Sequence, residues 1–113
     1  MTFVALDRIP ARLSCKELSK IRASRNIAII DVREDWEWAI SRINGAQNIP
    51  LRQIPGRVAE IPRDRHVVMV CQHGMRSAQA SAWLQTNGFE NVSNLEGGID
   101  AWSREIDPSV ARY

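Results

Sequence analysis

The stretch HVVMVCQHGMRS, residues 66–77, decides the fold that this sequence predicts. Residues 66–70 give the clearest strand in the chain, because four of them are apolar and three of those are valine, as in a strand buried on both faces. The strand runs straight into Cys71 and a polar loop, and a helix is expected from Ser77 to Asn87. A cysteine therefore lies at the carboxyl end of a buried strand, where parallel sheets bind their ligands.

The segments on both sides of this stretch alternate between strand and helix patterns. Ser14 and Glu17 form a capping box that begins a helix, and Pro55 interrupts the weakly helical segment 51–61. Further strands are expected over 26–32, 47–50 and 91–95, and further helices over 34–40 and 99–106. This alternation predicts one α/β domain across residues 1–113, with a central, mainly parallel β-sheet flanked by helices on both faces.

The composition excludes several classes of function. The net charge of +2 is too small to predict nucleic-acid binding, and no apolar run approaches the ~20 residues of a membrane-spanning helix. The first residues lack the layout of a signal peptide, so we expect a cytoplasmic protein. The two cysteines lie far apart and form no CxxC pair, which predicts neither a disulfide framework nor a dithiol site.

The loop that follows Cys71 can favour a negatively charged sulfur. A helix beginning at Ser77 points its unpaired N–H groups and the positive end of its dipole toward the loop, and Arg76 adds a permanent positive charge. Gly74 allows a tight curl in which successive amides converge on one anion, such as a thiolate or a bound thiosulfate. The alternative is that Cys71 is buried and inert, the commoner fate of a lone cysteine after an apolar strand.

Four stretches, in the right order along nearly the whole chain, are similar to the single-domain rhodanese family. They are residues 71–77 (CQHGMRS), 30–34 (IDVRE), 43–50 (INGAQNIP) and 94–102 (NLEGGIDAW). The first resembles the active-site loop of the family, and the second resembles its Asp-Val-Arg segment. One departure is Arg42, which stands where the family usually has a histidine, so no role of that histidine is carried over.

The resemblance implies a sulfurtransferase that uses no cofactor and no metal. The Cys71 thiolate would take the outer sulfur of thiosulfate, or of another small donor, as a persulfide, and an acceptor would then remove it. The acceptor would be a cellular thiol, including a thioredoxin-like or other sulfur-carrier protein, or cyanide in an assay. The anion-binding loop would consist of Gln72, His73, Gly74, Met75, Arg76 and Ser77.

Asp31 and Arg33 share a face at a strand end, and we expect both to be structural. In this interpretation Asp31 caps loop amides and Arg33 pairs with a carboxylate, either Glu37 or Glu96. His73 could tune the thiol, but a side chain facing solvent is the simpler interpretation.

The remaining singled-out residues are expected to be structural or are left open. The four tryptophans are expected to pack in the core and in pocket walls, and Cys15 is expected to be buried and inert. Arg42 is either a surface exchange or an added positive charge near the site. The tail from Asp107 to Tyr113 could cover the pocket or contact a partner.

Two rival functions remain open at this point. A small phosphatase or arsenate reductase on the same fold also pairs a cysteine with an arginine, but such loops place five residues between them, and here four residues separate Cys71 from Arg76. The other rival is a non-catalytic domain that binds a partner protein. Inactive relatives usually lose the cysteine, and this chain retains it together with the arginine.

Overall fold

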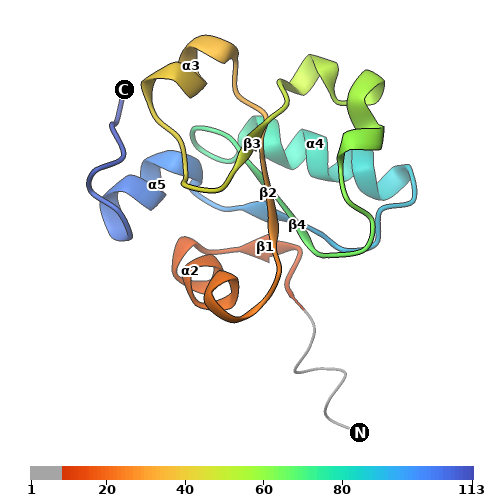
Figure 1. Ribbon diagram of the computed structural model, residues 1–113, viewed down its shortest axis with the longest axis horizontal. Coiled ribbons are helices and arrows are strands. Elements are labelled where there is room, and N and C mark those ends of the chain that lie inside the picture. Colours follow the sequence, from red (N-terminus) through yellow and green to blue (C-terminus); the bar gives the residue numbers. More distant parts are fainter. Residues whose placement is uncertain (1–8) are drawn as a thin grey trace, which may run out of the picture.

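The computed structural model describes residues 9–113, and its elements follow the predicted alternation (Figure 1). The strands are β1 (Arg12–Leu13), β2 (Ala28–Asp31), β3 (Gln47–Asn48), β4 (Val67–Val70) and β5 (Val92–Leu95). The α-helices are α2 (Cys15–Ser24), α3 (Asp35–Ile40), α4 (Met75–Thr86) and α5 (Gly98–Glu105). Two 3-10 helices, η1 (Leu51–Gln53) and η2 (Pro55–Glu60), replace the expected weak helix. Within residues 9–113, no helix has the length and apolar character needed to cross a bilayer.

All five strands pair in parallel, in the order β1-β5-β4-β2-β3, which confirms the predicted α/β fold with a parallel sheet. Strand β4 is central, because it pairs along its full length with β2 and over three residues with β5. Cys71, the residue that follows β4, therefore lies at the carboxyl edge of the sheet. Strand β1 was not predicted; it adds only two residues beside β5.

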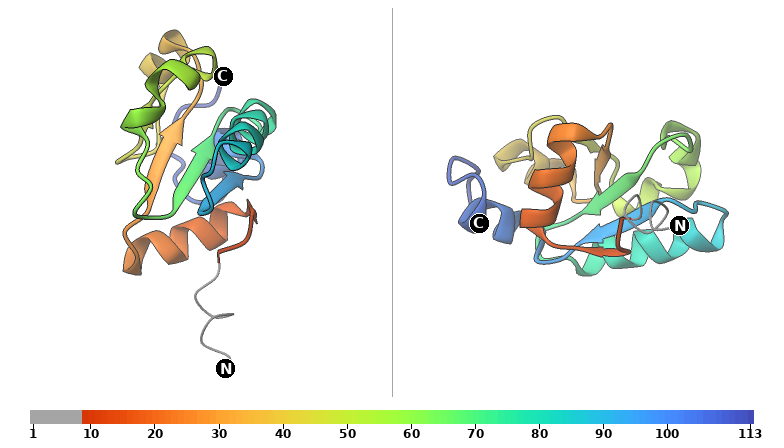
Figure 2. Two further views of the ribbon diagram at one scale, coloured as in Figure 1. Left: turned by 90° about the vertical axis from the view of Figure 1, so that its right-hand side faces the viewer. Right: turned by 90° about the horizontal axis from the view of Figure 1, so that it is seen from below.

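Alternate residues of the sheet face two separate apolar layers. Ile30, Val67 and Met69 pack with side chains of α4 and with the segment around the 3-10 helices. Ile29 and Val68 face the other way and pack with α2 and α5. Figure 2 shows the sheet edge-on, with α2 and α4 on opposite sides of it. Because both faces are covered, strand β4 and the first three residues of β2 are continuously apolar rather than alternating.

Helix α4 begins earlier than the sequence predicts. The expected first residue was Ser77, whereas the helix begins at Met75 with Gly74 as its N-cap. Gly74 has a φ of 103°, in the left-handed region that glycine adopts without strain, and this lets the chain turn directly from loop to helix. Arg76 and Ser77 consequently belong to the first turn of α4 and not to the loop before it.

The tryptophans differ in burial, although the sequence predicted that all four pack in the core and in pocket walls. Trp102 is buried, as expected, in the layer between the sheet and α5. Trp83 packs against the opposite layer and is partly buried. Trp36 is 61% exposed, so the prediction that it packs in the core is wrong. Its position on the short helix α3, outside both layers, explains the exposure.

Candidate active site

The loop from Cys71 to Gly74 is held in place through its carbonyl groups. The N–H of Ile99 donates to the carbonyl of Cys71 at 2.8 Å, and the N–H of Asp100 donates to the carbonyl of Gln72 at 3.0 Å. Both donors lie in the first turn of α5, whose N–H groups have no partner within the helix. These bonds draw the loop carbonyls toward α5 and leave the opposite side of the loop for N–H groups.

Gly98 is required for this close approach. A Cβ at Gly98 would lie 2.4 Å from the carbonyl oxygen of Cys71, and the residue has a φ of +60°. Any larger side chain would therefore displace the loop from α5. The turn at Gly97 and Gly98, just before the last helix, thus supports the Cys71 loop.

The sulfur of Cys71 lies inside the curl of the loop. The N–H of Gly74 donates to Cys71 Sγ at 3.1 Å, and the hydroxyl of Ser77 lies 3.3 Å from the same sulfur. The residue is only 1% exposed. Although the thiol is buried, the N–H of Gly74 points at the sulfur and the hydroxyl of Ser77 lies within reach of it.

Ser77 also contacts Asn94, a residue of β5 that sequence reasoning did not single out. The Ser77 hydroxyl is 2.5 Å from Asn94 Oδ1, while the amide nitrogen of Asn94 donates to the Gly74 carbonyl at 3.0 Å. A hydroxyl has one proton, so Ser77 can direct it either to Asn94 or to Cys71 Sγ. With a neutral thiol, the S–H can donate to Ser77; with a thiolate, the Ser77 proton can turn toward the sulfur.

Arg76 does not project freely into the loop. Its two terminal nitrogens form a bidentate ion pair with Glu37 of α3, at 2.6 Å to Oε1 and 2.9 Å to Oε2. The hydrogen bonds from Arg76 are the main reason that the pKa of Glu37 is lowered to about 2. The pKa of Arg76 is raised, chiefly by the bond to Glu37 and to a smaller extent by the charge of Cys71. Arg76 Nε has no partner among residues 9–113, so this edge of the guanidinium remains available to an anion.

Asp31 and Arg33 form a buried ion pair at the end of β2. Arg33 Nη2 lies 2.8 Å from Asp31 Oδ2, and neither side chain is more than 1% exposed. Arg33 has the carboxylate partner that the sequence predicted, but this partner is Asp31 and not Glu37 or Glu96; the only Glu37 atom that Arg33 reaches is the backbone carbonyl oxygen, at 3.3 Å. Asp31 is the last residue of β2 and Arg33 follows it by two residues, which lets the guanidinium fold back onto this carboxylate.

The other predicted loop residues lie at the rim of the site. Gln72 is half-buried and donates to the main-chain oxygen of Tyr113 at 2.9 Å. His73 is exposed, and Met75 is 81% exposed. Arg42 lies over the ring of Trp38, at 4.3 Å from its centroid, on the exposed side of α3.

Besides Asn94, two further residues of this site were not predicted to belong to it. Glu37 entered the sequence analysis only as a possible partner of Arg33, and Tyr113 only as the end of a tail. The hydroxyl of Tyr113 lies 2.7 Å from Glu37 Oε2, although 76 residues separate them. No periodicity or motif could reveal this pairing, because it depends on how α3 and the tail meet in space.

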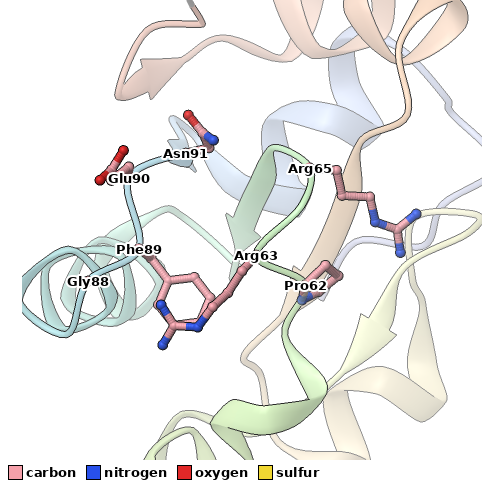
Figure 3. A pocket seen from close by; sticks show the side chains of 7 residues that line it. All are labelled: Pro62, Arg63, Arg65, Gly88, Phe89, Glu90 and Asn91. Atoms are coloured by element: carbon pink, nitrogen blue, oxygen red, sulfur yellow. The ribbon is translucent and has the colours of Figure 1, made fainter.

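A separate hollow lies at the opposite end of β4 and α4 from Cys71. It has a volume of about 230 Å³, and its lining includes Arg63, Arg65, Phe89 and Glu90. Figure 3 shows Arg63 lying over the ring of Phe89, 3.9 Å from its centroid, while Arg65 and Glu90 point away from it. No residue of the Cys71 loop lines this hollow. Among residues 9–113, no three His, Cys, Asp or Glu side chains converge to form a metal-binding group.

Comparison with known proteins finds relatives that match most of this chain, including the Cys71 loop. Residues 14–105 match the family model described as a rhodanese-like domain. A sulfurtransferase of Allochromatium vinosum is 41% identical over 92 residues, which cover 81% of this chain and 86% of the relative. The crystal structure of a rhodanese-like domain protein from Staphylococcus aureus is 30% identical, covers 92% of this chain and 99% of that one, and has a TM-score of 0.79.

A longer relative contains a comparable stretch as one part of its chain. The probable adenylyltransferase/sulfurtransferase MoeZ of Mycobacterium tuberculosis is 41% identical over 93 residues, which cover 80% of this chain. The matched stretch is 24% of MoeZ, so this chain spans about a quarter of the length of that relative.

Proposed function

We propose that this chain, which belongs to the rhodanese-like domain family, is a sulfurtransferase that carries sulfur as a persulfide on Cys71. The observation that carries the proposal is the 3.1 Å contact from the Gly74 N–H to Cys71 Sγ, inside a loop whose carbonyls are bound to α5. Such a loop favours the charged sulfur that nucleophilic attack requires. The relative of Allochromatium vinosum that is named a sulfurtransferase supports this class of reaction.

The first half-reaction loads the sulfur. The Cys71 thiolate attacks the outer sulfur of a donor such as thiosulfate, a new S–S bond forms on Cys71, and the S–S bond of the donor breaks. Sulfite leaves as a dianion with the bonding electron pair, and the outer sulfur, now bound to Cys71, keeps the negative charge that it carried in thiosulfate. The loop N–H groups and the first turn of α4 stabilise this anion as they stabilise the thiolate.

The second half-reaction unloads the sulfur. A thiolate acceptor attacks the outer sulfur of the persulfide, the S–S bond to Cys71 breaks, and Cys71 returns as a thiolate. Cyanide in the same role leaves as thiocyanate. We propose a cellular thiol as the natural acceptor, which includes the thiol of a thioredoxin-like or other sulfur-carrier protein.

Arg76 is proposed to hold an anionic donor through the edge of its guanidinium that Glu37 leaves free. The end of the guanidinium that carries the two terminal nitrogens already faces the Glu37 carboxylate. The four residues between Cys71 and Arg76 also make the loop shorter than the five-residue spacing that suits a phosphate-sized centre.

Peptide mass spectrometry after treatment with thiosulfate tests the proposal. One added sulfur is expected on the peptide that contains Cys71 and none on the peptide that contains Cys15. Thiocyanate formation from thiosulfate and cyanide is expected in the same preparation, without appreciable hydrolysis of an aryl phosphate. Phosphate hydrolysis without sulfur transfer would overturn the proposal and favour the phosphatase alternative.

A further inference from the structure

The tail after α5 runs back to the Cys71 loop and is fixed along its length. Val110 is buried, and its carbonyl accepts a hydrogen bond from the Ser103 hydroxyl at 2.6 Å. Arg112 reaches Asp100 at 2.9 Å. These contacts bring Tyr113 to the loop, where its main-chain oxygen accepts from Gln72. Figure 1 shows the C-terminal segment returning from α5 toward α3.

The Tyr113 hydroxyl lies between a cation and an anion, which fixes the direction of its proton. Arg33 Nη1 donates to the hydroxyl oxygen at 2.9 Å, and Glu37 Oε2 lies 2.7 Å from the same oxygen. Arginine can only donate, and an ionised carboxylate can only accept. The hydroxyl therefore accepts from Arg33 and donates to Glu37.

This hydrogen bond completes the set of donors around the Glu37 carboxylate. Oε1 accepts from Arg76 and from the N–H of Glu34, at 2.6 and 2.9 Å. Oε2 accepts from Arg76 and from Tyr113, at 2.9 and 2.7 Å. Each oxygen thus has two donors, and the side chain is 4% exposed. A carboxylate held by four donors has one orientation, and the guanidinium that pairs with it in a bidentate manner is held as well.

We propose that Tyr113 is a positioning residue that acts through Glu37 on Arg76 and thereby sets the preference of the site for anionic sulfur donors. This inference rests on the proposed function and names its substrate class. Because Glu37 occupies both terminal nitrogens of Arg76, an anion must be met by the remaining edge of the guanidinium. The direction of that edge is fixed only while the carboxylate of Glu37 is fixed.

The variant Tyr113→Phe removes the hydroxyl and keeps the rest of the tail contacts. The ring can still contact Trp36, whose centroid lies 6.0 Å away, and Arg33, whose guanidinium lies 5.7 Å from the ring centroid. The main-chain oxygen remains available to Gln72. Arg104→Ala is the matched control, because it breaks an exposed ion pair within α5 and leaves the tail contacts, Glu37 and Arg76 in place.

The test compares the rates at which a charged and an uncharged reagent alkylate the sulfur of Cys71. Iodoacetate and iodoacetamide both alkylate a thiolate with loss of iodide, and only the first is an anion. In Tyr113→Phe, alkylation of the Cys71 peptide by iodoacetate is expected to slow roughly threefold to tenfold, the range for loss of one hydrogen bond. Alkylation by iodoacetamide is expected to stay unchanged, and Arg104→Ala is expected to change neither rate. An equal slowing of both reagents would show a merely structural role and overturn the proposal.

A second variant shows whether Tyr113 acts through Glu37. In a Glu37→Gln background, Tyr113→Phe is expected to have no further effect on the ratio of the two alkylation rates. Independent, additive effects would overturn the proposal. In the transfer assay, Tyr113→Phe is expected to raise KM for thiosulfate with little change in kcat, and a fall in kcat alone would contradict it. If the wild-type chain forms no persulfide, the proposed function fails, while the alkylation ratio still decides the role of Tyr113.

Discussion

Cys15 and Cys71 are both at most 2% exposed, yet their sulfur atoms face opposite ends of backbone dipoles. Cys15 Sγ lies 3.7 Å from the carbonyl oxygen of Gly98 and 3.9 Å from that of Glu96. Cys71 Sγ instead accepts from the N–H of Gly74. Carbonyl oxygens favour a neutral thiol, and N–H groups favour a thiolate.

The electrostatic surroundings of Cys15 reinforce this difference. Burial raises the pKa of the Cys15 thiol to about 11, and the negative charge of Glu105 contributes in the same direction. Two cysteines that are buried to the same degree therefore face opposite backbone groups. The Cys71 loop turns an N–H group toward its sulfur because α5 binds the loop carbonyls, and we propose that this difference makes Cys71, and not Cys15, the reactive cysteine.

Exchanging each cysteine for serine should give the largest difference in the rate of sulfur transfer between the two sites. Cys71→Ser is expected to abolish sulfur transfer, because serine cannot form the persulfide. Cys15→Ser is expected to leave the rate within about twofold, since Cys15 does not reach the site. Initial rates of thiocyanate formation measure both, and circular dichroism checks that both variants fold. An active Cys71→Ser variant would place the nucleophile elsewhere.

Gly98→Ala should weaken the binding of the Cys71 loop to α5, which distinguishes the surroundings of Cys71 from those of Cys15. Its Cβ would lie 2.4 Å from the Cys71 carbonyl, so the loop must shift. We expect the transfer rate to fall roughly tenfold to a hundredfold, the effect of misplacing a reacting group by about 1 Å. We also expect the free energy of unfolding to fall by about 1–3 kcal/mol, because alanine is strained at a positive φ.

Gly56→Ala is the control for that variant. No atom lies within 4 Å of a Cβ at Gly56, and its φ is not in the strained range. Its stability, measured by urea denaturation, and its transfer rate should both match the wild type. If Gly98→Ala behaves as Gly56→Ala does, the support of the loop by α5 does not matter for activity.

Acid should affect the region of Cys71 more than that of Cys15. The folded-state pKa of Glu37, about 2, lies below its ordinary value, so its contribution to stability is present above pH ~4.5 and is lost as pH falls toward 2. That contribution is about 3 kcal/mol. Glu37→Gln is expected to be less stable at neutral pH and to show a flatter fall in the free energy of unfolding between about pH 5 and pH 2. Parallel pH profiles of the two proteins would contradict this assignment.

Local chemistry was enough to predict most of the fold. Apolar runs gave strands β2 and β4, and the Ser14–Glu17 capping box is present at the start of α2. Strand β1 escaped prediction because two residues carry no periodicity. The start of α4 was misplaced because Gly74 ends the loop by its left-handed conformation, and no side chain caps that helix.

Only the part of the site whose residues are contiguous in the sequence could be predicted. The loop around Cys71 was identified because its residues are contiguous. The partners of Arg33 and Arg76 were not, because ion pairing depends on which carboxylates the fold brings near. The Arg33 side chain folds back onto Asp31, the last residue of β2, and Glu37 of α3 meets Arg76. Tyr113 joins them from the far end of the chain.

The central claim is that Cys71, whose sulfur faces a peptide N–H, is the reactive cysteine, and that Cys15, whose sulfur faces carbonyl oxygens, is inert. Peptide mass spectrometry of the wild-type chain during alkylation by iodoacetamide at neutral pH tests this most directly. We expect the peptide that contains Cys71 to be alkylated well before the peptide that contains Cys15. Equal rates for the two peptides, or faster alkylation of the Cys15 peptide, would contradict the account.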